Sequence, residues 1–252
     1  MEILGIDVGG SGIKGAIVDS KTGRLLTERL RIPTPRPATP DAVAAVVAQL
    51  VHEKGWQGPI GCGFPAAIQH GRVRTAANID PGFLDLDLAA HLADATGCPV
   101  YALNDADAAG MTETRFGAAK DFDGVVLMVT IGTGLGTALF SNGTLMPNTE
   151  LGHIYLRKGV TAENHAAGRV RKDEGLSWSE WGDRFNRALQ QLEALLWPDL
   201  ILLGGGASKK FDRFADRIDV RAEVKPAQTL NEAGIVGAAV HAAELAREAS
   251  TR

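Results

Sequence analysis

Cysteine is scarce in this chain, and its scarcity excludes two kinds of structural framework. The 252 residues include only two cysteines, Cys62 and Cys98, and neither belongs to a CxxC pair or to a cluster with histidine. A disulfide scaffold and a structural zinc site both need more thiols at close spacing. We therefore expect both cysteines to be buried as small apolar side chains.

Long apolar runs and an excess of one charge are also missing. No apolar stretch approaches the length that crosses a membrane, and the first residues lack the basic segment and cleavage site of a secretory signal. The formal net charge is only -4, so the overall charge gives no reason to expect nucleic acid or a membrane as a partner. These features predict a soluble, cytoplasmic protein.

The first part of the chain has the pattern of three strands followed by a helix. Residues 3–8 and 13–18 are rich in apolar and β-branched residues on either side of a glycine-rich turn, which predicts a hairpin. Residues 24–32 are predicted as a third strand, and residues 41–54 as a helix with Asp41 as its N-cap. The order is that of a mixed α/β unit.

The hairpin pattern returns in the second half. Residues 124–131 and 137–140 are again strand-like and flank a second glycine-rich turn. This repetition predicts a duplicated α/β architecture of two lobes with a central cleft. We place the lobes at residues 1–108 and 109–252, with a final helix at residues 231–247 that is able to pack back on the first lobe.

The glycines of the first turn match a pattern shared by several nucleotide-binding proteins. Gly10, Gly12 and Gly15 give GxGxxG, but a dinucleotide site needs a helix after the turn, and here a strand follows. The further motifs of protein kinases and the GxxxxGK[ST] phosphate loop are absent from the sequence. Two glycine-tipped hairpins facing one cleft suit phosphate better, because their N–H groups can approach its oxygens. Either turn taken singly could also be an ordinary tight turn.

Asp105 is the candidate general base. It follows a predicted strand at residues 99–103 and opens a predicted helix at residues 105–116, the kind of position where α/β folds bind ligands. Phosphoryl transfer needs a carboxylate that accepts the proton of the attacking hydroxyl group. The alternative role for Asp105 is helix N-cap, and the two roles can coexist. We interpret Asp107 as a first-turn acid and not as a catalytic residue.

Other polar residues fit the two substrates of such a reaction. Glu150 and His153 offer the paired acceptor and donor that sugar hydroxyl groups need. Lys14 could neutralise a donor phosphate, and Asp7 could hold magnesium through water. Basic residues of the second half form either a path for a polyanion or a merely solvated surface. They are Arg169, Arg171, Lys172, Lys209 and Lys210.

Four motifs in this order resemble those of the ROK sugar kinases. They are residues 7–15 (DVGGSGIKG), 103–110 (LNDADAAG), 130–134 (TIGTG) and 150–153 (ELGH). Within that family the chain is most similar to kinases that phosphorylate glucose from inorganic polyphosphate, and this similarity spans nearly the whole chain. It extends to residues 63–65 (GFP), 75–78 (TAAN), 147–149 (PNT) and 204–210 (GGGASKK).

The resemblance implies an actin-like fold, which is a duplicated ribonuclease-H-like α/β fold, and it assigns residues to each substrate. Glucose would be bound by Asn78, Asn104, Asp105, Glu150, His153 and Glu163. The phosphoryl donor would be bound by Asp7, Gly9, Gly10, Ser11, Gly12, Lys14, Thr130, Gly132, Thr133, Gly134, Gly204, Gly205, Gly206, Lys209 and Lys210. Asp7 would also lie near Mg²⁺.

One departure from the wider family concerns zinc. The cysteine-rich segment that other members carry after the Gly152-His153 pair is missing here, so we expect no zinc. The resemblance also implies a homodimer. Three alternative functions stay open: a strictly ATP-dependent ROK sugar kinase, a sugar-sensing regulator, and a phosphatase of the same superfamily. The regulators carry an N-terminal helix-turn-helix, whereas this sequence starts at the first strand.

Overall fold

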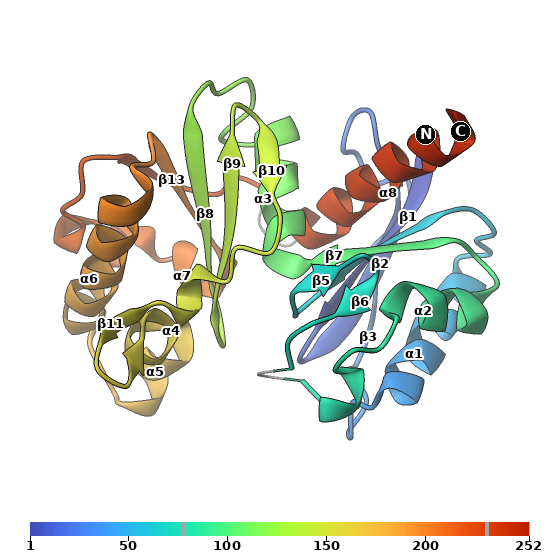
Figure 1. Cartoon of the computed structure of the whole chain (residues 1–252), viewed down its shortest axis with the longest axis horizontal. Helices are drawn as coiled ribbons and strands as arrows, with labels where there is room; N and C mark the ends of the chain where they lie inside the picture. Colours follow the sequence, from blue (N-terminus) through green and yellow to red (C-terminus); the bar gives the residue numbers. More distant parts are fainter. Residues whose placement is uncertain (77–78, 230–231, 252) are drawn as a thin grey trace. The chain divides into compact units, whose positions relative to one another are not determined.

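The chain forms two compact units in the computed structural model, which describes residues 1–76, 79–229 and 232–251 (Figure 1). The first unit comprises Met1–Thr112 together with Glu232–Arg252, and the second comprises Glu113–Asn231. The division falls inside helix α3 (Asp105–Phe116), and helix α8 (Ala233–Thr251) belongs to the first unit. In the described ranges, no helix is long and apolar enough to cross a membrane.

The first unit is built on a mixed sheet with the strand order β3-β2-β1-β4-β7. Its strands are β1 (Glu2–Gly9), β2 (Gly12–Asp19), β3 (Leu30–Ile32), β4 (Ile60–Phe64) and β7 (Val100–Asn104). The first three pair antiparallel, whereas β1, β4 and β7 run parallel. A separate small hairpin joins β5 (Ile68–Gln69) to β6 (Arg72–Val73). The carboxyl ends of β1, β4 and β7 therefore share one edge of the sheet.

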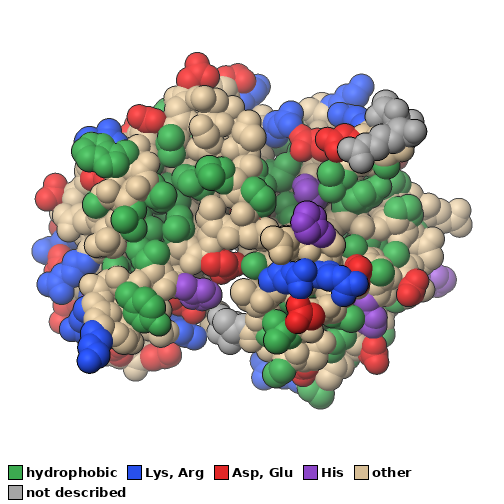
Figure 2. Space-filling model, viewed as in Figure 1, with side chains coloured by type: hydrophobic (Ala, Val, Ile, Leu, Met, Phe, Trp, Pro, Cys, Tyr) green, Lys and Arg blue, Asp and Glu red, His purple; other side chains and the backbone are tan. Residues whose placement is uncertain are grey.

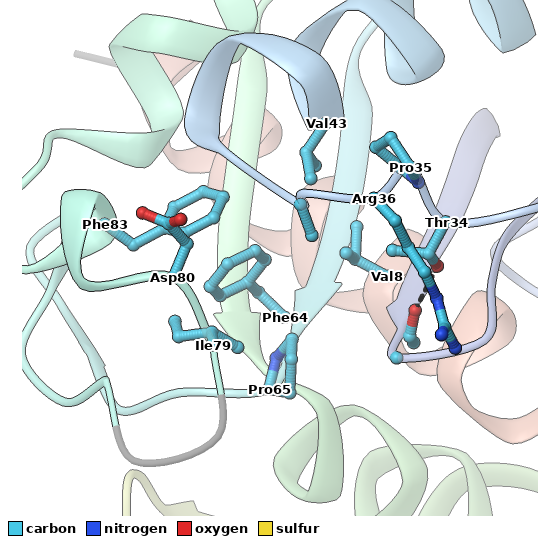
Figure 3. Close-up of a pocket in the computed structure, with 13 residues that line it drawn as sticks. Val8, Thr34, Pro35, Arg36, Val43, Phe64, Pro65, Ile79, Asp80 and Phe83 are labelled. Atoms are coloured by element: carbon cyan, nitrogen blue, oxygen red, sulfur yellow. Dashed lines mark hydrogen bonds between the residues drawn. The ribbon is translucent and has the colours of Figure 1, made fainter.

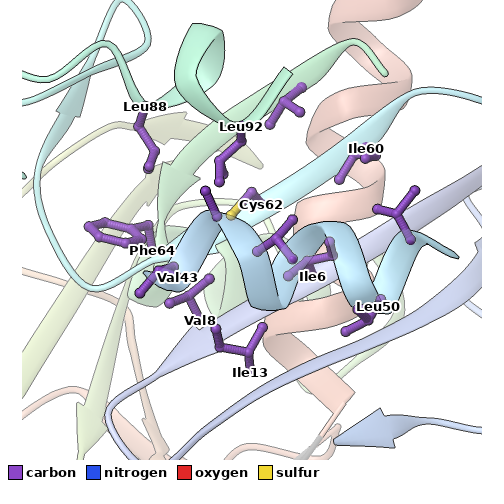
Figure 4. Close-up of a cluster of buried hydrophobic side chains, with 14 of the residues drawn as sticks. Ile6, Val8, Ile13, Val43, Leu50, Ile60, Cys62, Phe64, Leu88 and Leu92 are labelled. Atoms are coloured by element: carbon purple, nitrogen blue, oxygen red, sulfur yellow. The ribbon is translucent and has the colours of Figure 1, made fainter. Parts of the chain in front are cut away.

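Alternation along β1 separates two differently covered faces of this sheet. Leu4, Ile6 and Val8 are buried in one cluster with the helices α1 (Pro40–Glu53) and α2 (Leu88–Thr96), as Figure 4 shows for α1. On the other face, a Cβ added at Gly5 would overlap the carbonyl group of Ile235 in α8. Glycine thus lets the final helix lie directly on the strands.

Two local expectations in the first unit are wrong. The third strand is only three residues long, and residues 24–29 contribute no more than an isolated bridge between Leu25 and Val18. Helix α1 begins before Asp41: Pro40 takes the first turn, and the Thr39 side chain accepts the N–H of Ala42. Proline suits the first helical position because its missing N–H would have no partner there.

The second unit repeats the plan of the first, which confirms the predicted duplicated α/β fold. Its sheet has the order β10-β9-β8-β13-β14, with three antiparallel strands followed by parallel ones. The strands are β8 (Val125–Ile131), β9 (Leu135–Ser141), β10 (Thr144–Met146), β13 (Leu200–Gly204) and β14 (Glu223–Pro226). A short ladder pairs β11 (Tyr155–Arg157) with β12 (Val160–Thr161).

Helices α4 (Ala162–Ala166) and α6 (Trp178–Leu196) cover one face of the second sheet, and α5 (Gly168–Asp173) follows α4. Ser177 and Glu180 form a capping box at the start of α6. The fully buried Trp181 stacks on Phe185, with ring centroids 5.0 Å apart. This aromatic cluster anchors the long helix to the sheet.

Candidate active site

The first glycine turn joins β1 to β2 at the carboxyl edge of the first sheet. Gly9 and Gly12 are register partners, so Gly10 and Ser11 form the exposed tip. Two neighbours hold carbonyl groups of the turn. Thr34 Oγ1 donates to the Gly9 oxygen at 2.5 Å, and Arg31 Nη2 donates to the Ser11 oxygen at 2.6 Å. These contacts fix the turn before any ligand arrives.

Asp7 and Lys14 face each other across the same hairpin. Asp7 Oδ2 lies 2.9 Å from Lys14 Nζ, and both side chains are partly buried. A Cβ at Gly234 would lie 2.9 Å from Asp7 Cγ, so the start of α8 packs closely on this carboxylate. Cys62 is buried nearby, and its burial, with the charge of Asp7 as a smaller cause, raises the pKa of its thiol to about 12. It therefore stays protonated, and both cysteines are buried as expected.

A pocket of about 360 Å³ opens beside the first turn (Figure 3). Gly9 and Gly10 line one side, and Phe64 and Pro65 at the end of β4 line another. Most of its lining side chains are apolar. The charged residues of its lining are Arg36 and Asp80, and the Asp80 side chain accepts the N–H of Gly82 at 2.8 Å. The predicted sugar residue Asn78 lies outside the described residues.

Asn104 and Asp105 stand at the junction of β7 and α3. Asn104 Oδ1 accepts the N–H groups of Ala106 at 2.8 Å and Asp107 at 3.1 Å, and its Nδ2 donates to the Ala66 oxygen at 3.1 Å. Asn104 therefore caps α3, the role that the sequence left open for Asp105. The Asp105 side chain is partly exposed at the carboxyl edge of the sheet, whereas Asp107 is only 1% exposed.

The second glycine turn, residues 132–134, joins β8 to β9. The N–H of Gly132 donates to the Gly134 oxygen at 3.0 Å, and Gly132 and Thr133 are exposed. Gly205 forms a bridge with Ile131, the residue before the turn, and Gly204 is the register partner of Thr130. The second unit thus brings together two of the predicted donor segments, residues 130–134 and 204–206.

The Glu150 and His153 pair lies next to the start of β9. Glu150 Oε2 is 3.9 Å from His153 Nδ1. Thr137 Oγ1 accepts the N–H of Leu151 at 3.1 Å, and a Cβ at Gly152 would overlap a carbonyl oxygen of β9. Burial raises the pKa of Glu150, His153 lowers it, and the negative charge of Glu163 raises it further. Glu150 therefore keeps a proton to a higher pH than an ordinary glutamate.

Glu163 is mostly buried in α4, where its carboxylate contacts backbone. Oε2 accepts the N–H of Leu135 at 2.9 Å, and Oε1 lies 3.7 Å from Arg169 Nη2. Arg169 thus contacts Glu163, while Lys209 and Lys210 are exposed. Among the described residues, no three His, Cys, Asp or Glu side chains gather as a metal site would require.

Four residues around the first turn and its pocket were missed by sequence reasoning. They are Arg31, Thr34, Arg36 and Asp80. Arg31 lies near the end of the predicted third strand, and Thr34 and Arg36 follow it in a proline-rich stretch where no periodic pattern marks a role. The TPRP sequence of residues 34–37 was the available signal, because two prolines fix the backbone φ at their own positions and so restrict the loop.

The comparisons with known proteins agree with the motifs. The sequence profile described as "ROK family" matches residues 3–169. A polyphosphate glucokinase from Mycobacterium tuberculosis (strain CDC 1551 / Oshkosh) is 47% identical over 238 residues, covering 94% of this chain and 89% of the relative. The inorganic polyphosphate/ATP-glucomannokinase from Arthrobacter sp. strain KM is 46% identical, with a TM-score of 0.90, over 97% of this chain and 99% of that one. A ROK family glucokinase from Streptomyces griseus, solved with glucose and AMPPNP, is 25% identical with a TM-score of 0.82, over 97% and 100% of the two chains.

Proposed function

The chain belongs to the ROK family, and from that premise we propose that it transfers the terminal phosphoryl group of inorganic polyphosphate to the 6-hydroxyl group of glucose. The observation that carries this proposal is the 47% identity, over 94% of the chain, to a relative named polyphosphate glucokinase. The chain is an enzyme, and its reaction class is that of a sugar kinase. ATP is the second donor that we expect, in line with the name of the Arthrobacter relative.

Asp105 is the general base of this proposal. Its carboxylate takes the proton of the 6-hydroxyl group while the sugar oxygen forms a bond to the terminal phosphorus, and the bond from that phosphorus to the rest of the donor breaks. The capping of α3 by Asn104 supports this role, because the helix start is already satisfied beside Asp105. Glu150, His153 and Asn104 would bind the sugar hydroxyl groups, as the resemblance implies.

The two glycine turns and the adjoining residues 204–206 would bind the donor. Developing charge on the transferred group is stabilised best by donors that are already oriented, and the first turn is held by Thr34 and Arg31. Lys14 contributes a positive charge beside Asp7. These residues support phosphate binding without a GxxxxGK[ST] loop.

Magnesium fits this site through one protein carboxylate. Mg²⁺ commonly binds one or two carboxylates and completes its shell with water and substrate phosphates, so Asp7 suffices as the protein ligand. When bound there, the ion neutralises charge on the donor phosphates. A homodimeric assembly and a cytoplasmic location stay predictions from the resemblance and the composition.

A coupled assay tests the proposal with glucose and either polyphosphate or ATP as donor. We expect glucose 6-phosphate from both donors, with the higher kcat/KM for polyphosphate. Asp105→Asn should lower kcat by about two to four orders of magnitude while glucose still binds, because the base is lost and the shape is kept. Thr114→Ser, on the same helix, is the matched control. Near-normal turnover of Asp105→Asn would remove Asp105 from its role, and activity with ATP alone would favour the ATP-dependent alternative. Glucose binding without turnover would indicate a regulator.

A further inference from the structure

Leu135 directly follows the second glycine turn, and several parts of the second unit meet at its peptide groups. Its N–H donates to Glu163 Oε2 at 2.9 Å. Its carbonyl oxygen packs against Gly152, where a Cβ would overlap it. The backbone of Leu135 therefore joins the turn both to Glu163 and to the segment that carries Glu150 and His153.

The fit of Glu163 under the turn is close. Its side chain is only 13% exposed, and a Cβ at Gly134 would lie 2.5 Å from its Oε2 atom. A side chain at residue 134 would clash with the carboxylate in this position, so glycine leaves room for its contact with the Leu135 N–H. Glu163 itself is fixed in the first turn of α4, which Thr161 caps by accepting the N–H of Asn164 at 3.2 Å.

Arg169 holds the other end of the same turn. Its backbone N–H donates to the Gly132 oxygen at 3.2 Å, and a Cβ at Gly168 would lie 2.8 Å from that oxygen. Its side chain donates to Asn164 Oδ1 at 3.0 Å and lies 3.7 Å from Glu163 Oε1. The segment from α4 to α5 thus forms hydrogen bonds with the backbone on both sides of the turn, at the Gly132 oxygen and at the Leu135 N–H.

We propose that Glu163 is a positioning residue for the phosphoryl donor, acting by holding the Leu135 N–H and with it the second glycine turn. This inference rests on the proposed function, because it takes residues 132–134 as a donor-binding turn. A turn that is fixed in advance presents its N–H groups without reorganisation when the donor binds. The role is distinct from the sugar contact that the resemblance implies for Glu163.

Glu163 also acts on the sugar residues through its charge. It raises the pKa of Glu150, after burial and against the opposite effect of His153. Replacing Glu163 with a neutral residue should therefore lower the pKa of Glu150, whatever hydrogen bond the new side chain makes. The charge and the hydrogen bond of Glu163 can thus be separated by experiment.

Two variants separate the charge of Glu163 from its hydrogen bond: Glu163→Gln and Glu163→Ala. Glu223→Gln, at an exposed position on strand β14, is the matched control. An amide oxygen can still accept the Leu135 N–H, whereas alanine cannot. We expect Glu163→Ala to lower kcat/KM for polyphosphate by about 10- to 100-fold and Glu163→Gln to lower it by less than about 5-fold. Both variants should shift the acid limb of glucose binding to lower pH. Equal losses of glucose affinity in both variants, with donor constants unchanged, would overturn the proposal and make Glu163 a sugar ligand only.

Amide hydrogen exchange at Leu135 tests the positioning without any turnover. We expect the amide to be protected in the wild type and to exchange at least about 10-fold faster in Glu163→Ala. Gly134→Ala, which places a Cβ against the carboxylate, should have the same effect if Glu163→Ala folds poorly. A wild type without phosphoryl transfer would refute the proposed function, yet the exchange data would still report on the turn. An unchanged exchange rate of the Leu135 amide in both Glu163→Ala and Gly134→Ala would refute the positioning role.

Discussion

Glu150 is a carboxyl group whose surroundings disfavour its charge. Burial raises its pKa first, and Glu163 adds to the effect, while His153, with Nδ1 3.9 Å from Glu150 Oε2, opposes it. The ionised carboxylate accepts hydrogen bonds from sugar hydroxyl groups with both oxygens, whereas protonation turns one oxygen into a donor and weakens the acceptors. Proton binding to Glu150 therefore competes with sugar binding, and at a higher pH than for an ordinary glutamate.

We predict that glucose affinity falls as the pH is lowered through the raised pKa of Glu150, by about tenfold per pH unit below it. Calorimetry across the acid range would measure this limb. Glu150→Gln should bind glucose more weakly near neutrality and should lose the limb, because no proton is taken up at this position. The control Glu223→Gln should follow the wild type. An unchanged acid limb in Glu150→Gln would assign the titration to another group.

At the scale of elements, α3 and the segment before α8 are tied together by one buried carboxylate. Glu113 is 0% exposed, and its oxygens accept the N–H groups of Ala118 at 2.8 Å, Gln228 at 3.2 Å and Thr229 at 2.7 Å. The hydroxyl group of Thr229 donates to it as well. A buried charge is tolerated only when such donors surround it.

We predict that Glu113→Ala lowers the free energy of unfolding by about 3 to 5 kcal/mol, because several buried donors lose their shared acceptor. Glu113→Gln should cost less, since one amide oxygen still accepts. Denaturant titrations followed by circular dichroism would measure both. Lys120→Ala, exposed just after α3, is the control. If Glu113→Ala unfolds at the same denaturant concentration as that control, the network contributes nothing to stability.

At the scale of the whole molecule, a protein of formal net charge -4 has to bind a polyanion. Acidic and basic side chains are interspersed over the face shown in Figure 2, so no field of one sign covers that face. Electrostatic attraction of the polyanion must then come from local cationic side chains. At moderate salt it acts within about 8 to 10 Å of each of them. Lys209 and Lys210 are exposed and separated by two residues from the segment 204–206, in which Gly205 forms a bridge with Ile131.

We predict that Lys209→Ala/Lys210→Ala raises KM for polyphosphate by about tenfold at low salt, with a smaller effect on ATP, which carries fewer charges. Added salt should likewise raise the wild-type KM for polyphosphate more than the KM for ATP, and so reduce the preference for polyphosphate. The double variant Lys21→Ala/Lys120→Ala changes the net charge equally at exposed lysines outside the proposed donor site and serves as the control. Equal losses for both donors would show that these lysines do not select the donor.

Short-range patterns in the sequence were enough to predict most of the secondary structure, the fold class and the family of this protein. The apolar and β-branched residues of the hairpins and the glycines at both tips are signals carried by neighbouring residues, and each predicted its element. The repeated hairpin also predicted the duplicated fold, and the ordered motifs predicted the family that the profile match confirms. The third strand failed because its β-type residues, unlike those of β1 and β2, pair only at its end.

Packing between distant residues decided the rest. The sequence could place Asp105 at a helix start, but only the structure gives the capping role to Asn104, whose amide also reaches Ala66, 38 positions away. Arg31 contacts Ser11 across 20 positions, Glu163 contacts Leu135 across 28, and Glu113 contacts Thr229 across 116. Local propensity carries no information about such pairs. They form because the strand order and the packing of helices on each sheet bring segments that are distant in the sequence side by side, where their polar groups can pair.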